Sequence, residues 1–219
     1  ARQAVVIGAG LAGCAAAERL CARGWEVTLV ERHAGPAREA SGNLAGIFMP
    51  LLSKDDNIPT RLTRAAYLYA LRYWERLGGI GRAIEGAQCG VMQLARDAAH
   101  AQASRAIAAS GQYPRAFAEW LEAPAAAGLL GLPAPDGAWL FRSGGWARPG
   151  SVCEAMLDAC RTRLTRRFGS GSVHLARVGE EWEVRGADGA PIARAATVVL
   201  ASGADTPDIA QAARLPLAA

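Results

Sequence analysis

The sequence predicts an α/β protein whose main part is a Rossmann-like sheet interrupted by an insertion. Two apolar runs near the start, residues 4–7 and 27–30, have the length and composition of buried parallel strands. A glycine-rich turn and a helical pattern connect them. A third apolar run of the same kind, residues 197–200, lies near the end of the chain. The sheet therefore begins at the start of the chain and is completed by a strand that follows the insertion.

The composition is that of a folded globular protein: 51% of the 219 residues are hydrophobic and 20% are charged. The net charge of +4 permits a polyanionic partner, but the basic residues are scattered and form no block that would indicate a nucleic-acid-binding tail. The apolar residues 4–17 are interrupted by glycines and are fewer than the roughly 20 needed to span a bilayer. These features predict a soluble, cytoplasmic protein with no membrane association.

The cysteines form no C-x-x-C pair, and the histidines are isolated from one another. Cys14 and Cys21 are seven residues apart, as are Cys153 and Cys160, which places each pair on one face of a helix. We interpret these four residues as small buried hydrophobic side chains in a reducing compartment. No metal site is predicted.

The start of the chain has the order strand, G-x-G-x-x-G, helix, strand, acid. Gly8 permits the tight turn after the first strand, Gly10 leaves room for a pyrophosphate, and Gly13 lets the helix pack closely against the strand. The helix continues to a stop at Gly24, and its N-terminus offers free N–H groups and a positive dipole end to phosphates. Glu31, at the end of the second strand, is placed to accept hydrogen bonds from ribose hydroxyls. An acid at this position argues against the 2′-phosphate of NADP.

Residues 40–57, "ASGNLAGIFMPLLSKDDN", follow neither a strand period nor a helix period, and they contain the only lysine of the chain, Lys54. A loop of small residues lets a flat ring system lie against the backbone, so the segment favours a flavin over the nicotinamide of NAD. A long amphipathic helix follows, starting at Asn57 and ending at Gly78–Gly79. We predict that its packed face consists of Leu62, Ala66, Tyr69, Ala70, Tyr73 and Leu77.

The middle of the chain has the pattern of short strands mixed with helices. We predict a strand within 86–95, helices over 97–110 and 114–123, and a strand over 138–141 that leads into a turn at Gly144–Gly145.

The last third of the chain returns to the sheet. Ser151 and Glu154 form a capping box, which predicts a helix running to about Arg167. Two strands follow, 172–178 and 181–186, with a hairpin turn at Asp188-Gly189. The buried strand 197–200 then rejoins the strands at the start of the chain.

Several of these segments resemble a known family. "GAGLAGCAAAERLCARGWEVTLVER" resembles the FAD-binding start of the glycine oxidase and D-amino-acid oxidase superfamily. "ASGNLAGIFMPLLSKDDN" and "LFRSGGWARPGSVCEAML" are similar to one branch, the FAD-dependent oxidoreductase domain of the bifunctional tRNA 5-methylaminomethyl-2-thiouridine biosynthesis proteins. "TVVLASGADT" resembles the strand and glycine turn that contact FAD again in this superfamily. The resemblance extends along the whole chain and is loosest over about 95–135.

The resemblance implies an FAD enzyme that removes the carboxymethyl group of 5-carboxymethylaminomethyl(-2-thio)uridine at the tRNA wobble position and releases glyoxylate. It implies tRNA as the substrate and a methyltransferase domain of the same full-length protein as a partner. It also implies that the family's chain extends beyond both ends of this sequence. We therefore expect a first part of the FAD-binding domain at 1–80, a partial substrate-domain insertion at 81–147, and a second part of the FAD-binding domain at 148–219.

The expected cofactor-binding residues fall into four groups along the chain. They are Gly8, Ala9, Gly10, Leu11, Ala12 and Gly13 in the glycine turn, Glu31 and Arg32 after the second strand, Ser41, Gly42, Asn43, Leu44, Ala45 and Gly46 in the loop, and Val178, Ala201, Ser202 and Gly203 in the second half. The resemblance implies that Val178 meets adenine through its backbone and that the 201–203 turn lies beside the pyrophosphate. Lys54 is the candidate catalytic residue, because an ammonium is a compact charge that could face a flavin ring or a tRNA phosphate.

Two other functions are compatible with the same residues. One is an FAD-dependent amino-acid oxidase of the glycine or sarcosine type, and the pattern "SGNLAGIFMPLLSKDDN" favours the tRNA enzyme over it. The other is a non-catalytic nucleotide-binding fragment, which a flavin absorbance spectrum of the purified protein would distinguish from both enzymes.

Overall fold

Residues 2–210 of the chain are described by a computed structural model. The chain divides into two compact units: a first unit of residues 1–44 and 148–219, and a second unit of residues 45–147. The contacts divide the chain between Leu44 and Ala45, whereas a boundary near residue 80 is expected from the sequence. The physical reason lies within the second unit, where Phe48 and Trp74 meet edge to face with ring centroids 5.2 Å apart. This contact joins the middle of the predicted loop to the long helix.

The first unit is built on a four-stranded parallel sheet in the order β13-β1-β2-β9. The strands are β1 (Gln3–Ile7), β2 (Glu26–Val30), β9 (Leu164–Arg167) and β13 (Thr197–Leu200). Ile7 in β1 is in register with Val30 in β2 and with Leu200 in β13. The prediction that the three apolar runs lie parallel in one sheet is confirmed, and their carboxyl ends meet at one edge.

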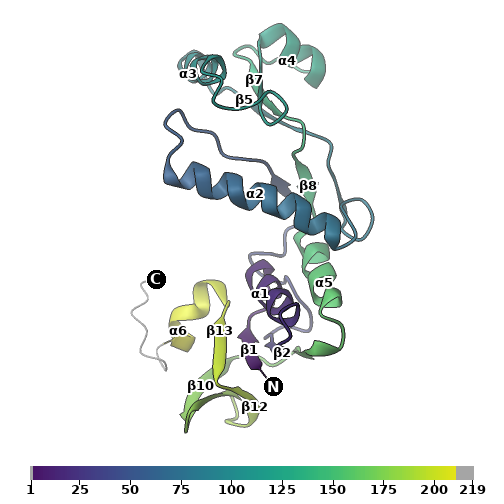
Figure 1. The fold of residues 1–219 in the computed structure, drawn as a ribbon, viewed down its shortest axis with the longest axis vertical. Coiled ribbons are helices and arrows are strands. Elements are labelled where there is room, and N and C mark those ends of the chain that lie inside the picture. Colours follow the sequence, from purple (N-terminus) through teal and green to yellow (C-terminus); the bar gives the residue numbers. More distant parts are fainter. Residues whose placement is uncertain (1, 211–219) are drawn as a thin grey trace. The chain divides into compact units, whose positions relative to one another are not determined.

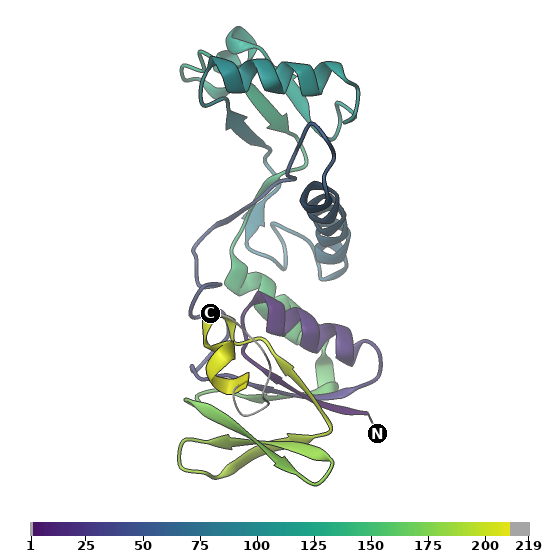
Figure 2. The same cartoon turned by 90° about the vertical axis from the view of Figure 1, so that its left-hand side faces the viewer.

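Two helices cover one face of this sheet. Helices α1 (Leu11–Cys21) and α5 (Pro149–Ala159) lie side by side (Figures 1 and 2). Cys14 and Cys21 from α1, with Cys153 and Cys160 beside α1, are all buried and free, so the predicted shared faces are confirmed. Burial raises the pKa of Cys160 to about 12, which keeps this thiol protonated and effectively apolar.

A three-stranded antiparallel sheet covers the opposite face (Figure 2). Its strands are β10 (Val173–Val178), β11 (Glu181–Gly186) and β12 (Pro191–Ala195), and helix α6 (Thr206–Ala210) follows β13. Val5, Ile7 and Val30 of the parallel sheet form one buried cluster with residues of this second sheet. Each fully buried aliphatic side chain contributes at most about 1.5–3 kcal/mol to stability. The predicted turn at Asp188-Gly189 is confirmed, with Gly189 at a φ of +80°.

The predicted capping box and the long helix after it are wrong. The N-cap of α5 is Arg148, the helix begins at Pro149, and the Ser151 hydroxyl donates to the Arg148 carbonyl at 2.8 Å. Beyond Cys160 the chain makes a short 3-10 turn, Arg161–Arg163, and then enters β9. Arg161 has a φ of +53°, which breaks the helical path. Residues 164–167 then pair with the open edge of β2. This pairing satisfies their backbone N–H and C=O groups as well as further helical turns would.

The second unit contains two small antiparallel sheets and three helices. One sheet has the order β3-β8-β4, with β3 (Gly46–Phe48), β8 (Gly145–Ala147) and β4 (Gly86–Ala87), and the other has the order β5-β7-β6, with β5 (Val91–Leu94), β7 (Ala138–Phe141) and β6 (Glu119–Leu121). The helices are α2 (Ile58–Arg76), α3 (Ala98–Ala109) and α4 (Ala123–Leu130). The predicted strand at 138–141 and helix near 97–110 are confirmed, while 86–95 contains two strands instead of one.

The long helix α2 has the predicted ends but only part of the predicted packed face. The Asn57 side chain accepts a hydrogen bond from the Thr60 amide at 3.1 Å, and Gly78, at a φ of +109°, follows the last turn. Leu62 is 68% exposed and Tyr69 is 49% exposed in the described structure. Tyr73 is buried as predicted, and the other buried residues of the helix are Thr60 and Tyr67, which were not predicted. The helix is rotated toward them because Tyr67 packs against Phe117 and Thr60 bonds to Ser53.

The helix predicted over 114–123 is also wrong, because residues 119–121 form strand β6. Trp120 meets Trp139 of β7 edge to face, with ring centroids 5.6 Å apart. Glu119 is buried and pairs with Arg115 and, at 2.6 Å, with Arg142. The contacts with Trp139 and Arg142, which are distant in sequence, outweigh the local helical propensity. No helix within residues 2–210 is both long and apolar enough to cross a membrane.

Candidate cofactor-binding site

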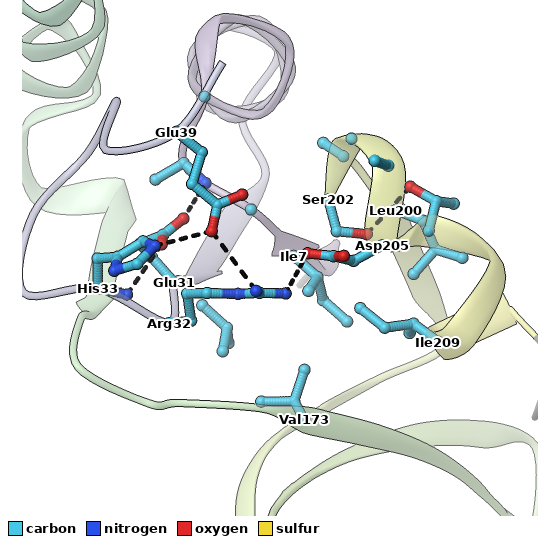
Figure 3. Close-up of a pocket in the computed structure, with 18 of the residues that line it drawn as sticks. Ile7, Glu31, Arg32, His33, Glu39, Val173, Leu200, Ser202, Asp205 and Ile209 are labelled. Atoms are coloured by element: carbon cyan, nitrogen blue, oxygen red, sulfur yellow. Dashed lines mark hydrogen bonds and ion pairs between the residues drawn. The ribbon is translucent and has the colours of Figure 1, made fainter. Parts of the chain in front are cut away.

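A cavity of about 710 Å³ opens at the carboxyl ends of β13, β1 and β2 in the first unit (Figure 3). In open parallel sheets, ligands bind in this position because helix N-termini and loops gather there. The predicted residues that line the cavity are Gly8, Ala9, Gly10, Leu11, Ala12, Glu31, Arg32, Ser41, Ala201, Ser202 and Gly203. The structure therefore brings together residues from three separate parts of the chain. The predicted residues outside the cavity lining are Gly13, Gly42, Asn43, Leu44, Ala45, Gly46, Lys54 and Val178.

Each of the three glycines of the motif is required, or favoured, for a different structural reason. Gly8 has a φ of +100°, and a Cβ there would overlap the carbonyl oxygen of Ala201. A Cβ on Gly13 would overlap the carbonyl oxygen of Gly8, so this glycine lets α1 approach the turn. Gly10 has an ordinary φ of −76°, and a Cβ there would lie 3.1 Å from the Ser41 hydroxyl, at the cavity wall. Gly10 therefore leaves space open in the cavity, whereas Gly8 and Gly13 are required for the close packing of the turn and the helix.

The N-terminus of α1 faces the cavity without a side-chain cap from its own N-cap residue, Gly10. The Leu11 amide donates to the Ser41 hydroxyl at 3.1 Å, which brings the loop after β2 against the first helical turn. The first amides of a helix have no intrahelical acceptor and carry the positive end of the helix dipole. This end of the cavity is therefore suited to an anionic group such as a phosphate.

Glu31 is a buried carboxylate in the cavity wall, only 8% exposed. One oxygen accepts a hydrogen bond from the Ala9 amide at 2.7 Å, and the other accepts one from the His33 amide at 2.9 Å. These two bonds fix the carboxylate relative to the glycine turn. A carboxylate has about four acceptor positions, so each oxygen keeps a lone pair for a ligand hydroxyl.

Three side chains that the sequence interpretation did not select also surround the cavity. Asp205 forms an ion pair with Arg32 at 2.5 Å, and Glu39 lies 3.5 Å from the other side of the same guanidinium (Figure 3). The His33 ring lies 2.8 Å from Glu39. The hydrogen bond from His33 and the charge of Arg32 hold the pKa of Glu39 below its ordinary value. The signal that could have identified them is position, since charged residues that follow parallel strands meet at one edge of the sheet.

Val178, the expected adenine contact, lies at the end of its strand that is away from the cavity. Val178 pairs with Glu181 at the far end of β10, while Val173, at the beginning of β10, lines the cavity. The sequence pattern located the strand but not the end of it that lines the cavity.

The boundary between the two units falls within the loop that is predicted to face a flavin ring. There is little room for a side chain at position 42, because a Cβ on Gly42 would lie 2.9 Å from the Glu39 carbonyl oxygen. Leu44 is 84% exposed, and Ile47 in strand β3 is 72% exposed. Lys54 is exposed in a turn shortly before α2. These residues present apolar and charged groups at the surfaces of their units, outside the described cavity.

The chain matches the family of FAD dependent oxidoreductases over residues 3–218. It is 49% identical over 211 residues to the tRNA 5-methylaminomethyl-2-thiouridine biosynthesis bifunctional protein MnmC of Paraburkholderia phytofirmans, covering 95% of this chain and 32% of that protein. It is 43% identical over 201 residues to the protein of the same name from Cupriavidus necator, covering 92% and 31%. The chain thus spans about a third of the length of the curated relatives it matches.

Solved structures show the same fold. Iminodiacetate oxidase from Chelativorans sp. BNC1 is similar with a TM-score of 0.76 and 25% identity, over 95% of this chain and 57% of that one. Glycine oxidase from Geobacillus kaustophilus is similar with a TM-score of 0.78 and 18% identity, over 99% and 60%. The predicted fold class is confirmed by this similarity and by the family match.

Proposed function

Because the chain belongs to the family of FAD-dependent oxidoreductases, we propose that it is the oxidoreductase part of a tRNA-modifying enzyme. The proposed reaction removes the carboxymethyl group from 5-carboxymethylaminomethyl(-2-thio)uridine at the wobble position. The observation that carries this proposal is identity of 42–49% to bifunctional tRNA 5-methylaminomethyl-2-thiouridine biosynthesis proteins, over more than nine tenths of this chain. The same curated name recurs in relatives from several bacterial genera.

The proposed chemistry is oxidation of a C–N bond followed by hydrolysis. The substrate group is a secondary amine bearing CH2–COO⁻. Loss of two electrons and two protons from the N–CH2 unit gives a C=N bond, and addition of water then breaks that bond. The products are the aminomethyl uridine and glyoxylate. Bound FAD supplies the acceptor for the two electrons, and the protein supplies binding and orientation.

The residues of the first unit fit the adenosine diphosphate part of FAD. The open space at Gly10 and the N-terminal amides of α1 would hold the pyrophosphate, and Glu31 would accept from the ribose hydroxyls. The turn of Ala201, Ser202 and Gly203 would provide a second wall for the pyrophosphate. We place the adenine beside Val173, in place of the predicted Val178, because Val173 lines the cavity.

The remaining predicted residues belong to the flavin end of the proposal. We propose that Ser41, Gly42, Asn43, Leu44, Ala45 and Gly46 provide the surface on which the isoalloxazine ring lies. Glycine at position 42 is required by the turn itself, because a Cβ there would lie 2.9 Å from the Glu39 carbonyl oxygen. Lys54 is proposed as the positive charge near the ring, where it would favour the negative charge that builds up on reduction.

The second candidate function is an oxidase of small amino acids. The structural similarity to iminodiacetate oxidase favours it, because iminodiacetate, like the modified uridine, carries an N-carboxymethyl amine. Both candidates therefore share one substrate group, and they differ in what is attached to the nitrogen. The relatives' names favour tRNA.

The partners follow from the same proposal. The relatives are called bifunctional and are about three times as long as this chain, which supports a methyltransferase domain in the same polypeptide. That domain would methylate the amine that the oxidoreductase exposes. We propose the cytoplasm as the location, because tRNA is the substrate.

The test is nucleoside analysis of tRNA carrying the carboxymethylaminomethyl group after incubation with the purified full-length protein and an electron acceptor. We expect the modified uridine to be replaced by the aminomethyl form with release of glyoxylate. Unchanged tRNA together with rapid oxidation of free glycine or iminodiacetate would favour the second candidate. Purified protein with no flavin spectrum and no turnover would support a non-catalytic nucleotide-binding fragment.

A further inference from the structure

Helix α2 has one long face on which every residue is exposed. Residues three, four and seven positions apart lie on the same side of a helix, and this rule groups eight exposed residues of α2 on one side. They are Ile58, Arg61, Leu62, Ala65, Leu68, Tyr69, Arg72 and Arg76. Leu62 and Tyr69 are 68% and 49% exposed, although the sequence pattern predicts that they pack against protein. The helix has 19 residues, so this open face of α2 is about 28 Å long.

The open face carries positive charge that no acidic residue balances. Among the described residues, Arg61 and Arg72 take part in no ion pair and no side-chain hydrogen bond. The single acidic residue of α2, Glu75, is already paired with Arg82. Arg72 and Arg76 are one helical turn apart, so their charges repel each other unless an anion lies between them. The charges of this face therefore complement a polyanion.

Tyr69 adds a fixed aromatic ring to the same face. Its ring stacks on the Tyr73 ring, with centroids 5.5 Å apart and an angle of 23° between the planes. The Arg76 guanidinium lies 5.6 Å from the centroid of the Tyr73 ring. Tyr73 is buried, so it holds Tyr69 in place while half of the Tyr69 surface stays open to a ligand. An exposed aromatic ring between arginines is the arrangement on which unpaired nucleic-acid bases stack.

Tyrosine and arginine are also common at protein interfaces, so the choice between RNA and protein depends on other features. The unpaired arginines favour RNA, because phosphates supply the negative charge that the face lacks. The relatives' names supply a polyanion of this kind, a tRNA. The open face also begins shortly after Lys54 in the chain, the charge proposed to lie near the flavin ring. RNA next to a wobble base that reaches the flavin would therefore find this face nearby.

We propose that the open face of α2 docks the anticodon arm of the substrate tRNA. Arg61 and Arg72 contact backbone phosphates, and Tyr69 stacks on an unpaired base of the loop. The inference rests on the proposed function and assigns its macromolecular substrate a surface. Phosphate contacts position the RNA without reading its sequence, whereas stacking on Tyr69 requires a base that is free of a duplex.

The experiment titrates fluorescein-labelled tRNA carrying the carboxymethylaminomethyl group with the FAD-loaded full-length polypeptide at several salt concentrations. Arg61→Gln and Arg72→Gln should each weaken binding several-fold and reduce the slope of log affinity against log salt by about 0.7–0.9, the value for one phosphate. Both should raise KM for tRNA and leave kcat unchanged, because neither residue contacts the reacting group. Arg105→Gln is the matched control, since Arg105 is an exposed arginine of α3 that is already paired with Glu122 at 2.8 Å. It should bind tRNA as the wild type does.

Two variants of Tyr69 test the stacking contact. Tyr69→Leu removes the ring and keeps an apolar side chain, while Tyr69→Phe keeps the ring. We expect Tyr69→Leu to bind tRNA roughly tenfold more weakly with an unchanged salt slope, because loss of a neutral ring releases no counterions. Tyr69→Phe should bind as the wild type does. Equal affinity of the leucine and phenylalanine variants would overturn the stacking contact.

Failure of the proposed function and failure of the docking surface give different results. A wild-type protein that does not bind the tRNA would contradict the proposed function. Wild-type binding that is unchanged by Arg61→Gln, Arg72→Gln and Tyr69→Leu would overturn the docking surface and leave the function in place.

Leu62→Gln tests for a protein occupant of the same face. If the face is open in the full-length protein without tRNA, this exposed substitution should leave the unfolding temperature at the wild-type value. A clear fall in unfolding temperature would show that another part of the polypeptide, or a second copy, covers Leu62. That result would overturn the proposal in favour of a protein interface.

Discussion

At the scale of single residues, Glu31 has a structural role in addition to the ribose contact proposed for it. Its carboxylate joins the glycine turn to the end of β2 through the Ala9 and His33 amides. The acid was predicted as a ribose ligand from its place after the second strand. Its structural role could not be predicted, because the two amides contact the carboxylate only when the glycine turn is folded.

We expect Glu31→Gln to weaken both FAD binding and the fold. The amide has one acceptor oxygen, so one backbone N–H faces an NH2 group, which costs about 1–3 kcal/mol of unfolding free energy. Loss of the charged acceptor should reduce FAD affinity by about 1.5–3 kcal/mol. Urea unfolding of the apoprotein and FAD titration measure the two effects separately. Unchanged FAD affinity would count against the ribose assignment.

Gly10→Val should abolish FAD binding with little effect on the apoprotein fold. The backbone at Gly10 has a φ of −76° that any residue adopts, so the branched side chain causes no backbone strain there. Its Cβ meets the Ser41 hydroxyl at 3.1 Å, and its methyl groups enter the space proposed for the pyrophosphate. Flavin absorbance after gel filtration measures retention.

The matched control is Gly150→Ala in the first turn of α5, where a Cβ would meet atoms only at 3.8 Å and beyond. This variant should retain FAD and gain about 0.4–1 kcal/mol of stability, since alanine loses less entropy on folding. A Gly10→Val protein that keeps its flavin would show that the pyrophosphate lies elsewhere.

Lys54→Met should lower the reduction potential of the bound flavin and slow its reduction by substrate, with FAD affinity little changed. Removal of a nearby cation disfavours the negative charge of the reduced ring. Spectroelectrochemistry measures the potential. If Lys54 instead contacts a tRNA phosphate, the potential stays constant while tRNA affinity falls and depends less steeply on salt. No change in either quantity would make Lys54 a bystander.

At the scale of elements, local signals identified the helices and strands that are complete in themselves. The β1–α1–β2 segment is specified by a glycine spacing and two apolar runs, and α2 by its cap and its closing glycines. Strands β6 and β9 were predicted as helix because their sequences contain helix-forming residues. Both are short strands whose stability comes from a partner far away in the chain, β7 and β2 respectively. Pairing between strands that are distant in the chain cannot be predicted from the pattern of a short sequence segment.

The contact of α1 with α5 gives a pH-dependent stability. Burial raises the pKa of Cys160 from 9.0 to about 12 and also raises that of Cys21. The folded state therefore disfavours the thiolate, so the stabilisation is complete below pH 9 and is lost as the pH rises toward 12. Urea unfolding midpoints should fall over this interval.

A Cys160→Ala variant is the control for this titration. It should show a shallower decline of stability between pH 9 and 12, because one of the perturbed thiols is gone. An identical decline in both proteins would show that other groups cause the alkaline loss.

At the scale of the whole molecule, the site is assembled by topology. The parallel order β13-β1-β2 brings residues near positions 8, 31 and 202 to one edge of a sheet. The nucleotide end of the site was predictable because the superfamily motif is local. The Arg32, Glu39 and Asp205 arrangement was not, since it requires knowing that β13 lies beside β1. The division of contacts after Leu44 was not predicted for a related reason, because only the β3–β8 pairing shows that residues after Leu44 join the second unit.

The central claim is that a tRNA-borne N-carboxymethyl amine is the electron donor to this family member's FAD. The most direct measurement is anaerobic mixing of the FAD-loaded full-length protein with tRNA carrying 5-carboxymethylaminomethyl uridine, followed by flavin absorbance and glyoxylate analysis. We predict loss of the oxidised flavin spectrum with one glyoxylate released per flavin, and no change with tRNA that lacks the modification. A flavin that stays oxidised with the modified tRNA but is reduced by free glycine or iminodiacetate would contradict the claim.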